Sequence, residues 1–176
     1  MIKLKHILKE ITEDDFLNKP SDEIVSQLGR PAFSSDAEAI KYIDTLKTTP
    51  FPNGFSDMPS EITLYRVLVL RGDKKVNENE LGTHFISDPD TIDRDWLENV
   101  GILDEMGYDY DEESDELYDK DTELWLLTCK VSKTNIDYKA TLEHRMDFPT
   151  EKEFTLKSPT GVRVISKEEL DLEDYL

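Results

Sequence analysis

The first third of the chain carries hydrophobic residues at the spacing of amphipathic helices. Ser21 and Ser35 precede two of the hydrophobic groups, where a side-chain oxygen can cap the first turn of a helix. The spaced apolar positions are Leu4, Ile7, Leu8 and Ile11, then Ile24, Val25 and Leu28, then Ala39, Ile40, Ile43 and Leu46. A proline- and glycine-containing run at 49–54 ends the pattern. We therefore expect an N-terminal helical region over residues 1–50, followed by a core over residues 51–176, within a single compact domain.

After residue 60 the pattern changes to that of strands, in which apolar and polar residues alternate. The predicted strands cover residues 61–70, 83–87, 123–131, 153–157 and 162–166. The run 158–161, Ser-Pro-Thr-Gly, is typical of a hairpin turn and would join the last two strands. A helix is predicted after Ser87, with Asp88 as its N-cap and Pro89 as its first residue. Its apolar stripe would consist of Ile92, Trp96, Leu97 and Val100. The sequence thus predicts an α+β fold.

The composition narrows the classes of partner. The chain has 40 acidic and 21 basic residues, giving a net charge of -19. This charge repels nucleic acids and anionic lipids, so we expect no direct nucleic-acid contact and a neutral or basic partner. No run approaches the roughly 18 apolar residues of a membrane span, and the N-terminus lacks a signal-peptide core, so a soluble cytoplasmic protein is expected. Cys129 is the only cysteine and is expected to be a small buried hydrophobe.

Much of the negative charge lies in one segment, which runs from Asp104 to Glu123. This segment contains 11 acidic residues and one basic residue. We expect it to lie outside the core as a mobile loop or short hairpin that attracts a basic target. Its hairpin would be built on Tyr108, Tyr110, Leu117 and Tyr118. A calcium loop is disfavoured, because Ser114 stands where the glycine of such a loop belongs.

Arg66 is the residue that first points to a chemistry. It lies in a predicted strand, on the face that it shares with Ile62, Leu64 and Leu68. A guanidinium is costly to desolvate, so either an internal carboxylate or a bound phosphate is expected to meet it. The alternative is an arginine whose charged end reaches solvent at the sheet edge.

Three short segments, taken in chain order, carry a resemblance to a known family. They are Leu64-Tyr65-Arg66, Gly82-Thr83-His84-Phe85-Ile86-Ser87 and Pro149-Thr150-Glu151-Lys152-Glu153-Phe154. Together they resemble the arginine-serine-glutamate class of mono-ADP-ribosyltransferases. That class has an arginine closing its first core strand, a strand ending in phenylalanine-hydrophobe-serine-threonine-serine, and a Glu-x-Glu turn. The resemblance implies an ADP-ribosyltransferase-like split β-sandwich, and the acidic bias is similar in style to phage-encoded members of this fold.

The resemblance also implies a reaction. The protein would take NAD as a substrate, break the bond between nicotinamide and ribose, and transfer ADP-ribose to an arginine of a protein acceptor. Glu153 would stabilise the oxocarbenium-like transition state, and Glu151 would orient and deprotonate the acceptor guanidinium. On an extended strand both carboxylates would project from one face. Arg66 would bind the NAD phosphates, and Ser87 would position Glu153 and the nicotinamide ribose. The further candidate contacts to NAD are Tyr65, His84 and Phe85.

The sequence departs from the family pattern at Ser87-Asp88-Pro89, where the second serine is missing and Asp88 adds a negative charge. The lost serine favours an alternative, in which the protein keeps the transferase fold as a non-catalytic binding or virion-associated module. A second alternative is an acidic decoy that mimics nucleic acid, which the net charge favours. Concentration of the acidic residues in one segment counts against the decoy.

Overall fold

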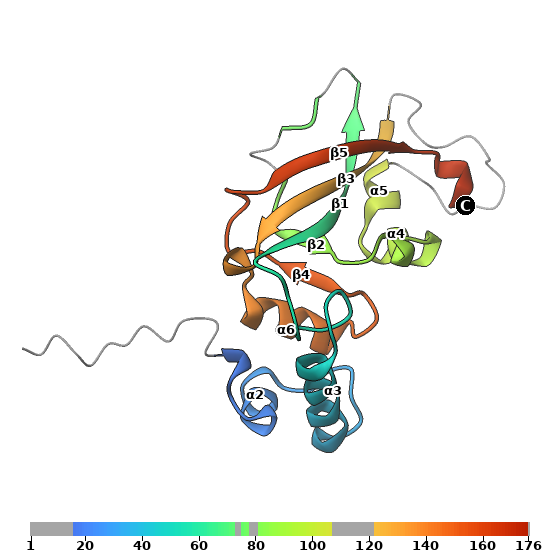
Figure 1. The fold of residues 1–176 in the computed structure, drawn as a ribbon. Coiled ribbons are helices and arrows are strands. Elements are labelled where there is room, and N and C mark those ends of the chain that lie inside the picture. Colours follow the sequence, from blue (N-terminus) through green and yellow to red (C-terminus); the bar gives the residue numbers. More distant parts are fainter. Residues whose placement is uncertain (1–15, 73–74, 78–80, 107–121, 176) are drawn as a thin grey trace, which may run out of the picture.

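A five-stranded antiparallel sheet forms the centre of the molecule (Figure 1). The computed structural model describes residues 16–72, 75–77, 81–106 and 122–175. The strands are β1 (Glu61–Arg71), β2 (His84–Ile86), β3 (Thr122–Ser132), β4 (Glu153–Thr155) and β5 (Arg163–Leu170). Their order across the sheet is β4-β2-β1-β3-β5. Each of the five strands lies at a predicted position, and the fold belongs to the α+β class.

The predicted hairpin between the last two strands is wrong. β4 pairs with β2 and β5 pairs with β3, so the two strands lie at opposite edges of the sheet. The connection between them crosses the end of the sheet, where Leu156 N donates to Thr83 O (2.7 Å) and Asn135 Nδ2 donates to Ser158 O (2.8 Å). A turn sequence shows where the chain changes direction, whereas the pairing of short strands depends on partners far away in sequence.

The alternating pattern of β1 separates two hydrophobic cores. Ile62 and Leu64 are at most 1% exposed and pack against one core on the first face of the sheet. That core also contains Phe85, Leu127, Cys129, Ile136, Phe154 and Leu156. Val67, on the opposite face, belongs to a second core under α4 (Arg94–Asn99) and α5 (Ile102–Met106). The prediction that Cys129 is buried is confirmed, since it is 0% exposed.

The N-terminal helices form a third cluster with a helix that the sequence pattern did not reveal. The helices α2 (Ser21–Leu28) and α3 (Asp36–Thr48) confirm the helical prediction for the described part of the N-terminal region. Their buried residues pack against Leu142 and Met146 of α6 (Tyr138–Asp147). In Figure 1, α6 lies between the sheet and these two helices. The side chain of Asp137 caps α6 by accepting from Ala140 N (2.9 Å).

The helix predicted after Ser87 begins later than expected. Asp88 caps a single 3-10 turn, η1 (Pro89–Thr91), and α4 itself begins at Arg94. Asp93 is the cap of α4, because its carboxylate accepts from Trp96 N (2.8 Å). The backbone at Ile92, which follows η1, is extended, so the α-helix begins only after Asp93.

Two predictions reach beyond the described residues. Residues 107–121, which include the proposed hairpin tyrosines and most of the acidic segment, lie outside them, as do Leu4 to Ile11 of the first predicted helix. In the described part of the chain, none of the helices combines the length and the apolar character that crossing a membrane requires.

Candidate functional site

A cavity of about 840 Å³ lies along one edge of β1. β3 pairs with β1 along its whole length, from Glu61 to Arg71, whereas the short strand β2 pairs with it at Tyr65. The β2-side edge of β1 beyond Tyr65 therefore faces the cavity. The charged and polar side chains in its lining are Tyr65, Arg66, Lys75, Asn77, His84, Trp96, Asn99, Glu105, His144, Glu151 and Glu153.

Arg66 reaches from β1 toward the strand β2. Its Nη1 donates to the backbone carbonyl of His84 (2.8 Å), and a side chain at Gly82 would begin 3.6 Å from its Nη2. Burial lowers the pKa of Arg66, and the negative charges of Glu153 and Glu105 oppose this shift. Its Nε is buried without a hydrogen-bond partner among the described residues. Arg66 thus lines the cavity, although its unpartnered Nε is enclosed by protein.

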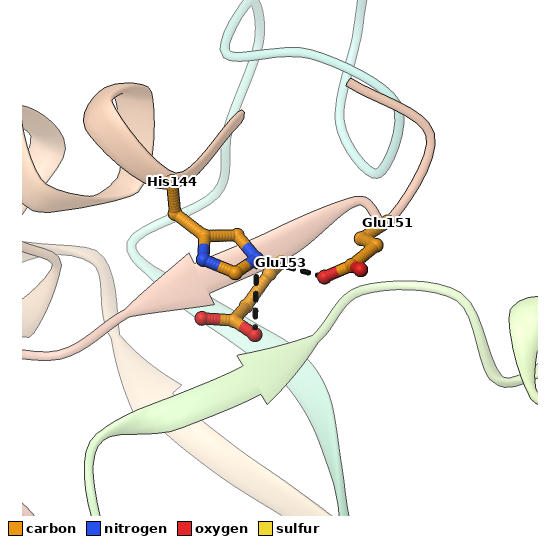
Figure 2. Close-up of side chains that lie close together, drawn as sticks. All are labelled: His144, Glu151 and Glu153. Carbon is orange, nitrogen blue, oxygen red and sulfur yellow. Dashed lines mark hydrogen bonds and ion pairs between the residues drawn. The ribbon is translucent and has the colours of Figure 1, made fainter. Parts of the chain in front are cut away.

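The Glu-x-Glu pair converges on one imidazole (Figure 2). His144, in the last turn of α6, lies with its Nε2 2.8 Å from Glu151 Oε2 and 3.4 Å from Glu153 Oε2. The side chain of Glu151 is 12% exposed and that of Glu153 is 9% exposed. Two nearly buried carboxylates thus share a single histidine.

The two carboxylates meet through a turn, which corrects the expectation of a regular extended strand. β4 begins at Glu153, and Lys152 has a positive φ of 48°, in the left-handed region. Glu151 N donates to Phe148 O (3.2 Å), which closes the turn that leads back from α6. The pair faces one side because of this turn geometry and not because of strand alternation.

Ser87 holds this turn from the back and is absent from the lining of the cavity. Its Oγ lies 2.9 Å from Pro52 O and 3.2 Å from Lys152 O, and its backbone N–H also donates to Lys152 O (3.3 Å). Beside it, Lys152 Nζ contacts Asp88 Oδ2 at 2.6 Å. The charge that Asp88 adds is therefore paired with a lysine. Ser87 contacts the residue before Glu153, and its hydroxyl is occupied by backbone carbonyls.

The other predicted contacts have different surroundings. His84 Nδ1 contacts Glu153 Oε1, so the Glu153 carboxylate lies between two imidazoles. Tyr65 lines the cavity and is partly buried against the second core. Phe85 also contributes to the lining, but it is 1% exposed and packs within the first core. The structure thus brings Arg66, His84, Glu151 and Glu153 together and leaves Ser87 behind them.

Arg145 is a buried residue of this region that the sequence pattern did not indicate. It is 1% exposed, and its Nε donates to the backbone carbonyl of Glu153 (2.9 Å). Its guanidinium lies over the ring of Phe154, with 4.6 Å from Cζ to the ring centroid, and 5.4 Å from that of Phe55. Burial lowers the pKa of Arg145 to about 10, so the group is charged at neutral pH.

His144 and Arg145 were missed for a common reason, because the helix that carries them was not predicted. The sequence does contain one sign of this helix, because Asp137 can serve as its N-cap. The apolar residues that follow at a spacing of four are Tyr138, Leu142 and Met146. The helix also buries Thr141 and Arg145, which weakens its amphipathic pattern.

Comparisons with protein-family models, with curated proteins and with solved structures found no match to this chain.

Proposed function

We propose that the protein is an NAD-dependent mono-ADP-ribosyltransferase that modifies an arginine of a protein acceptor. The proposal includes an ADP-ribosyltransferase-like split β-sandwich as the finer description of the α+β fold. The observation that carries it is the meeting of Arg66, Glu151 and Glu153 in one cavity. β2 lies between β1, which carries Arg66, and β4, which begins at Glu153. Arg66 and Glu151 are 85 positions apart in the chain, so only the fold brings them to one site.

The chemistry of the cavity suits a phosphate-bearing substrate with a glycosidic bond. A guanidinium binds phosphate oxygens through several donors, and Arg66 lines the cavity while its Nη1 donates to the His84 carbonyl. A cavity of about 840 Å³ is large enough for a dinucleotide-sized ligand, since ligand pockets span about 300–1,000 Å³. The phosphates would lie toward Arg66 and the nicotinamide ribose toward the two carboxylates.

The two carboxylates would divide the reaction. When the bond to nicotinamide breaks, positive charge develops on the ribose, and the Glu153 carboxylate stabilises it. Glu151 prepares the acceptor by orienting its guanidinium and removing a proton. The net charge of -19 favours a basic acceptor protein and disfavours direct contact with nucleic acid.

One observation favours the non-catalytic alternative. The Ser87 hydroxyl lies within hydrogen-bond distance of two backbone carbonyls and outside the lining of the cavity, so it is not placed to touch the nicotinamide ribose. A protein of this kind would retain the cavity and its Arg66 but would bind NAD or a similar nucleotide without cleaving it.

Release of nicotinamide distinguishes the enzyme from the non-catalytic binding module. The purified protein is incubated with NAD, and free nicotinamide is measured by chromatography. Release that is lost in Glu153→Gln and kept in Glu168→Gln, an exposed acid of β5, supports the enzyme. Binding of NAD without any release supports the binding module. Absence of both would rule out an NAD site.

A further inference from the structure

We propose that His144, Glu151 and Glu153 form a binding site for one divalent transition-metal ion of the zinc class. The ligand atoms are His144 Nε2 and one carboxylate oxygen from each glutamate. Imidazole with carboxylates is a donor set that suits Zn²⁺ and its neighbours in the first transition series. The three side chains come from the end of α6 and from the turn before β4 (Figure 2).

The spacing of the ligand atoms fits a small metal ion. All three lie within 4.8 Å of one another, and Nε2 is 2.8 Å and 3.4 Å from the two carboxylate oxygens. An ion with bonds of about 2.0–2.2 Å holds adjacent ligand atoms about 3–3.5 Å apart. Small side-chain adjustments would therefore close the shell around an ion.

Hydrogen bonding alone satisfies this cluster poorly. The Nε2 of His144 carries at most one hydrogen, which cannot point at both carboxylates at once. The two glutamate side chains are 12% and 9% exposed, so water screens their mutual repulsion only weakly. A dication between the three atoms would contact each of them and offset the repulsion.

The surrounding residues hold the three ligands in place, as supporting contacts do in metal sites. His84 contacts Glu153 Oε1, which leaves Oε2 directed at the ion position. Arg145 holds the backbone of Glu153 (2.9 Å), and the ring of Phe148 packs against His144 with centroids 5.2 Å apart. The remaining coordination positions would face the cavity, where water or a ligand can enter.

Arg66 and Lys75 are the arginine and lysine side chains in the described lining of the same cavity, and Arg66 contacts the residues around the site. Its charge lowers the affinity for a metal ion, but it does not occupy the ligand atoms. Its Nη1 is bonded to the His84 carbonyl, while the two oxygens of Glu153 contact imidazoles.

One consequence rests on the proposed function. Glu153 would be the carboxylate that stabilises the oxocarbenium, and a metal-bound carboxylate has less charge to offer. Metal binding would therefore inhibit cleavage of NAD, and the metal-free protein would be the active form.

Calorimetric titration of Zn²⁺ into chelator-treated, full-length protein tests the site directly. We expect one equivalent to bind, and Co²⁺ as a second probe to give a visible absorption band that Zn²⁺ abolishes. His144→Ala and Glu151→Gln should both lose this binding, whereas His84→Ala should weaken it about 10- to 100-fold. The matched control is Glu143→Gln, an exposed acid one residue from His144, which should bind as the natural sequence does.

Folding of each variant is checked by circular dichroism and by its urea midpoint. Glu151→Gln keeps the shape of the side chain, whereas His144→Ala removes most of it. Absence of binding, or equal binding in the natural sequence and in a folded Glu151→Gln, would overturn the site. The titration contains no NAD, so its result does not depend on the proposed enzyme. Inhibition of nicotinamide release by Zn²⁺ is measured separately.

Discussion

Arg145 Nε donates a hydrogen bond to the backbone carbonyl of Glu153 at 2.9 Å. This bond joins a fully buried cation of α6 to the first residue of β4, and it places the proposed catalytic carboxylate without touching it. The guanidinium lies over the rings of Phe154 and Phe55. The position of the Glu-x-Glu turn therefore depends on the packing of α6.

Replacing this arginine by lysine should destabilise the protein although the charge is kept. Arg145→Lys loses the planar fork that reaches Glu153 O and Asn53 O, and it leaves an ammonium among aromatic rings. We expect the free energy of unfolding to fall by about 1.5–3 kcal/mol, the range for hydrogen bonds to charged groups. Urea denaturation measures it. Arg163→Lys, at an exposed position of β5, is the matched control and should change little; an equal effect in both would contradict the role of Arg145.

Replacing Arg66 should weaken the binding of NAD without destabilising the protein. Burial disfavours its charged form, so Arg66→Met should leave the free energy of unfolding unchanged or higher. The affinity for NAD should fall by about 1.5–3 kcal/mol, because a charge-assisted contact to phosphate is lost. Calorimetry with NAD and urea denaturation give the two quantities. Unchanged affinity in the variant would remove Arg66 from the binding site.

The sequence predicted the positions of the strands well, because each strand carries a local pattern, but it did not predict the pairing of β4 and β5. The alternation in β1 placed Arg66 on a defined face, and the Glu-x-Glu pair stood out as a motif. The site was predicted incompletely because its other parts depend on contacts made only after folding. His144 lies seven residues before Glu151, on a helix whose polar buried residues obscure its pattern, and the role of Ser87 depends on a loop at Pro52. A hydroxyl cannot be assigned to a ligand or to the backbone from sequence order alone.

Ser87 should therefore act on the turn more than on the substrate. Ser87→Ala removes the hydroxyl hydrogen that Pro52 O or Lys152 O accepts, and we expect a loss of about 1–3 kcal/mol in the free energy of unfolding. Ser87→Thr keeps the hydroxyl and serves as the comparison. If Ser87→Ala keeps full stability but loses NAD binding, the hydroxyl contacts the substrate and this assignment fails.

Replacement of Glu151 and of Glu153 should affect NAD hydrolysis and ADP-ribose transfer differently. Under the proposed function, Glu153→Gln should abolish both NAD hydrolysis and transfer, because the charge that would stabilise the oxocarbenium is removed. Glu151→Gln should abolish mainly the transfer to an arginine acceptor and leave hydrolysis. Nicotinamide release and labelling of an acceptor by fluorescent NAD report the two activities in parallel. Equal loss of both in each variant would show that the pair does not divide the reaction.

The ion pair between Asp88 and Lys152 should stabilise the protein in a pH-dependent way. The hydrogen bond from Lys152 lowers the pKa of Asp88 below its ordinary value of 3.8. The folded state thus keeps the carboxylate deprotonated at a lower pH than the unfolded state does. The stabilisation is complete above about pH 4 and is lost as the pH falls through the lowered pKa.

Asp88→Asn tests this dependence, because asparagine can still accept from Asp90 N and keep the cap of η1. At pH 7 the variant should be less stable by up to about 1 kcal/mol, a modest amount because water screens the partly exposed pair. The difference should shrink toward zero as the pH falls through the lowered pKa of Asp88, where the carboxylate of the natural protein becomes protonated as well. Urea denaturation of both proteins across this range measures it, with Asp90→Asn as the control. A difference that stays constant down to pH 2 would show that the cap, and not the charge, accounts for the effect.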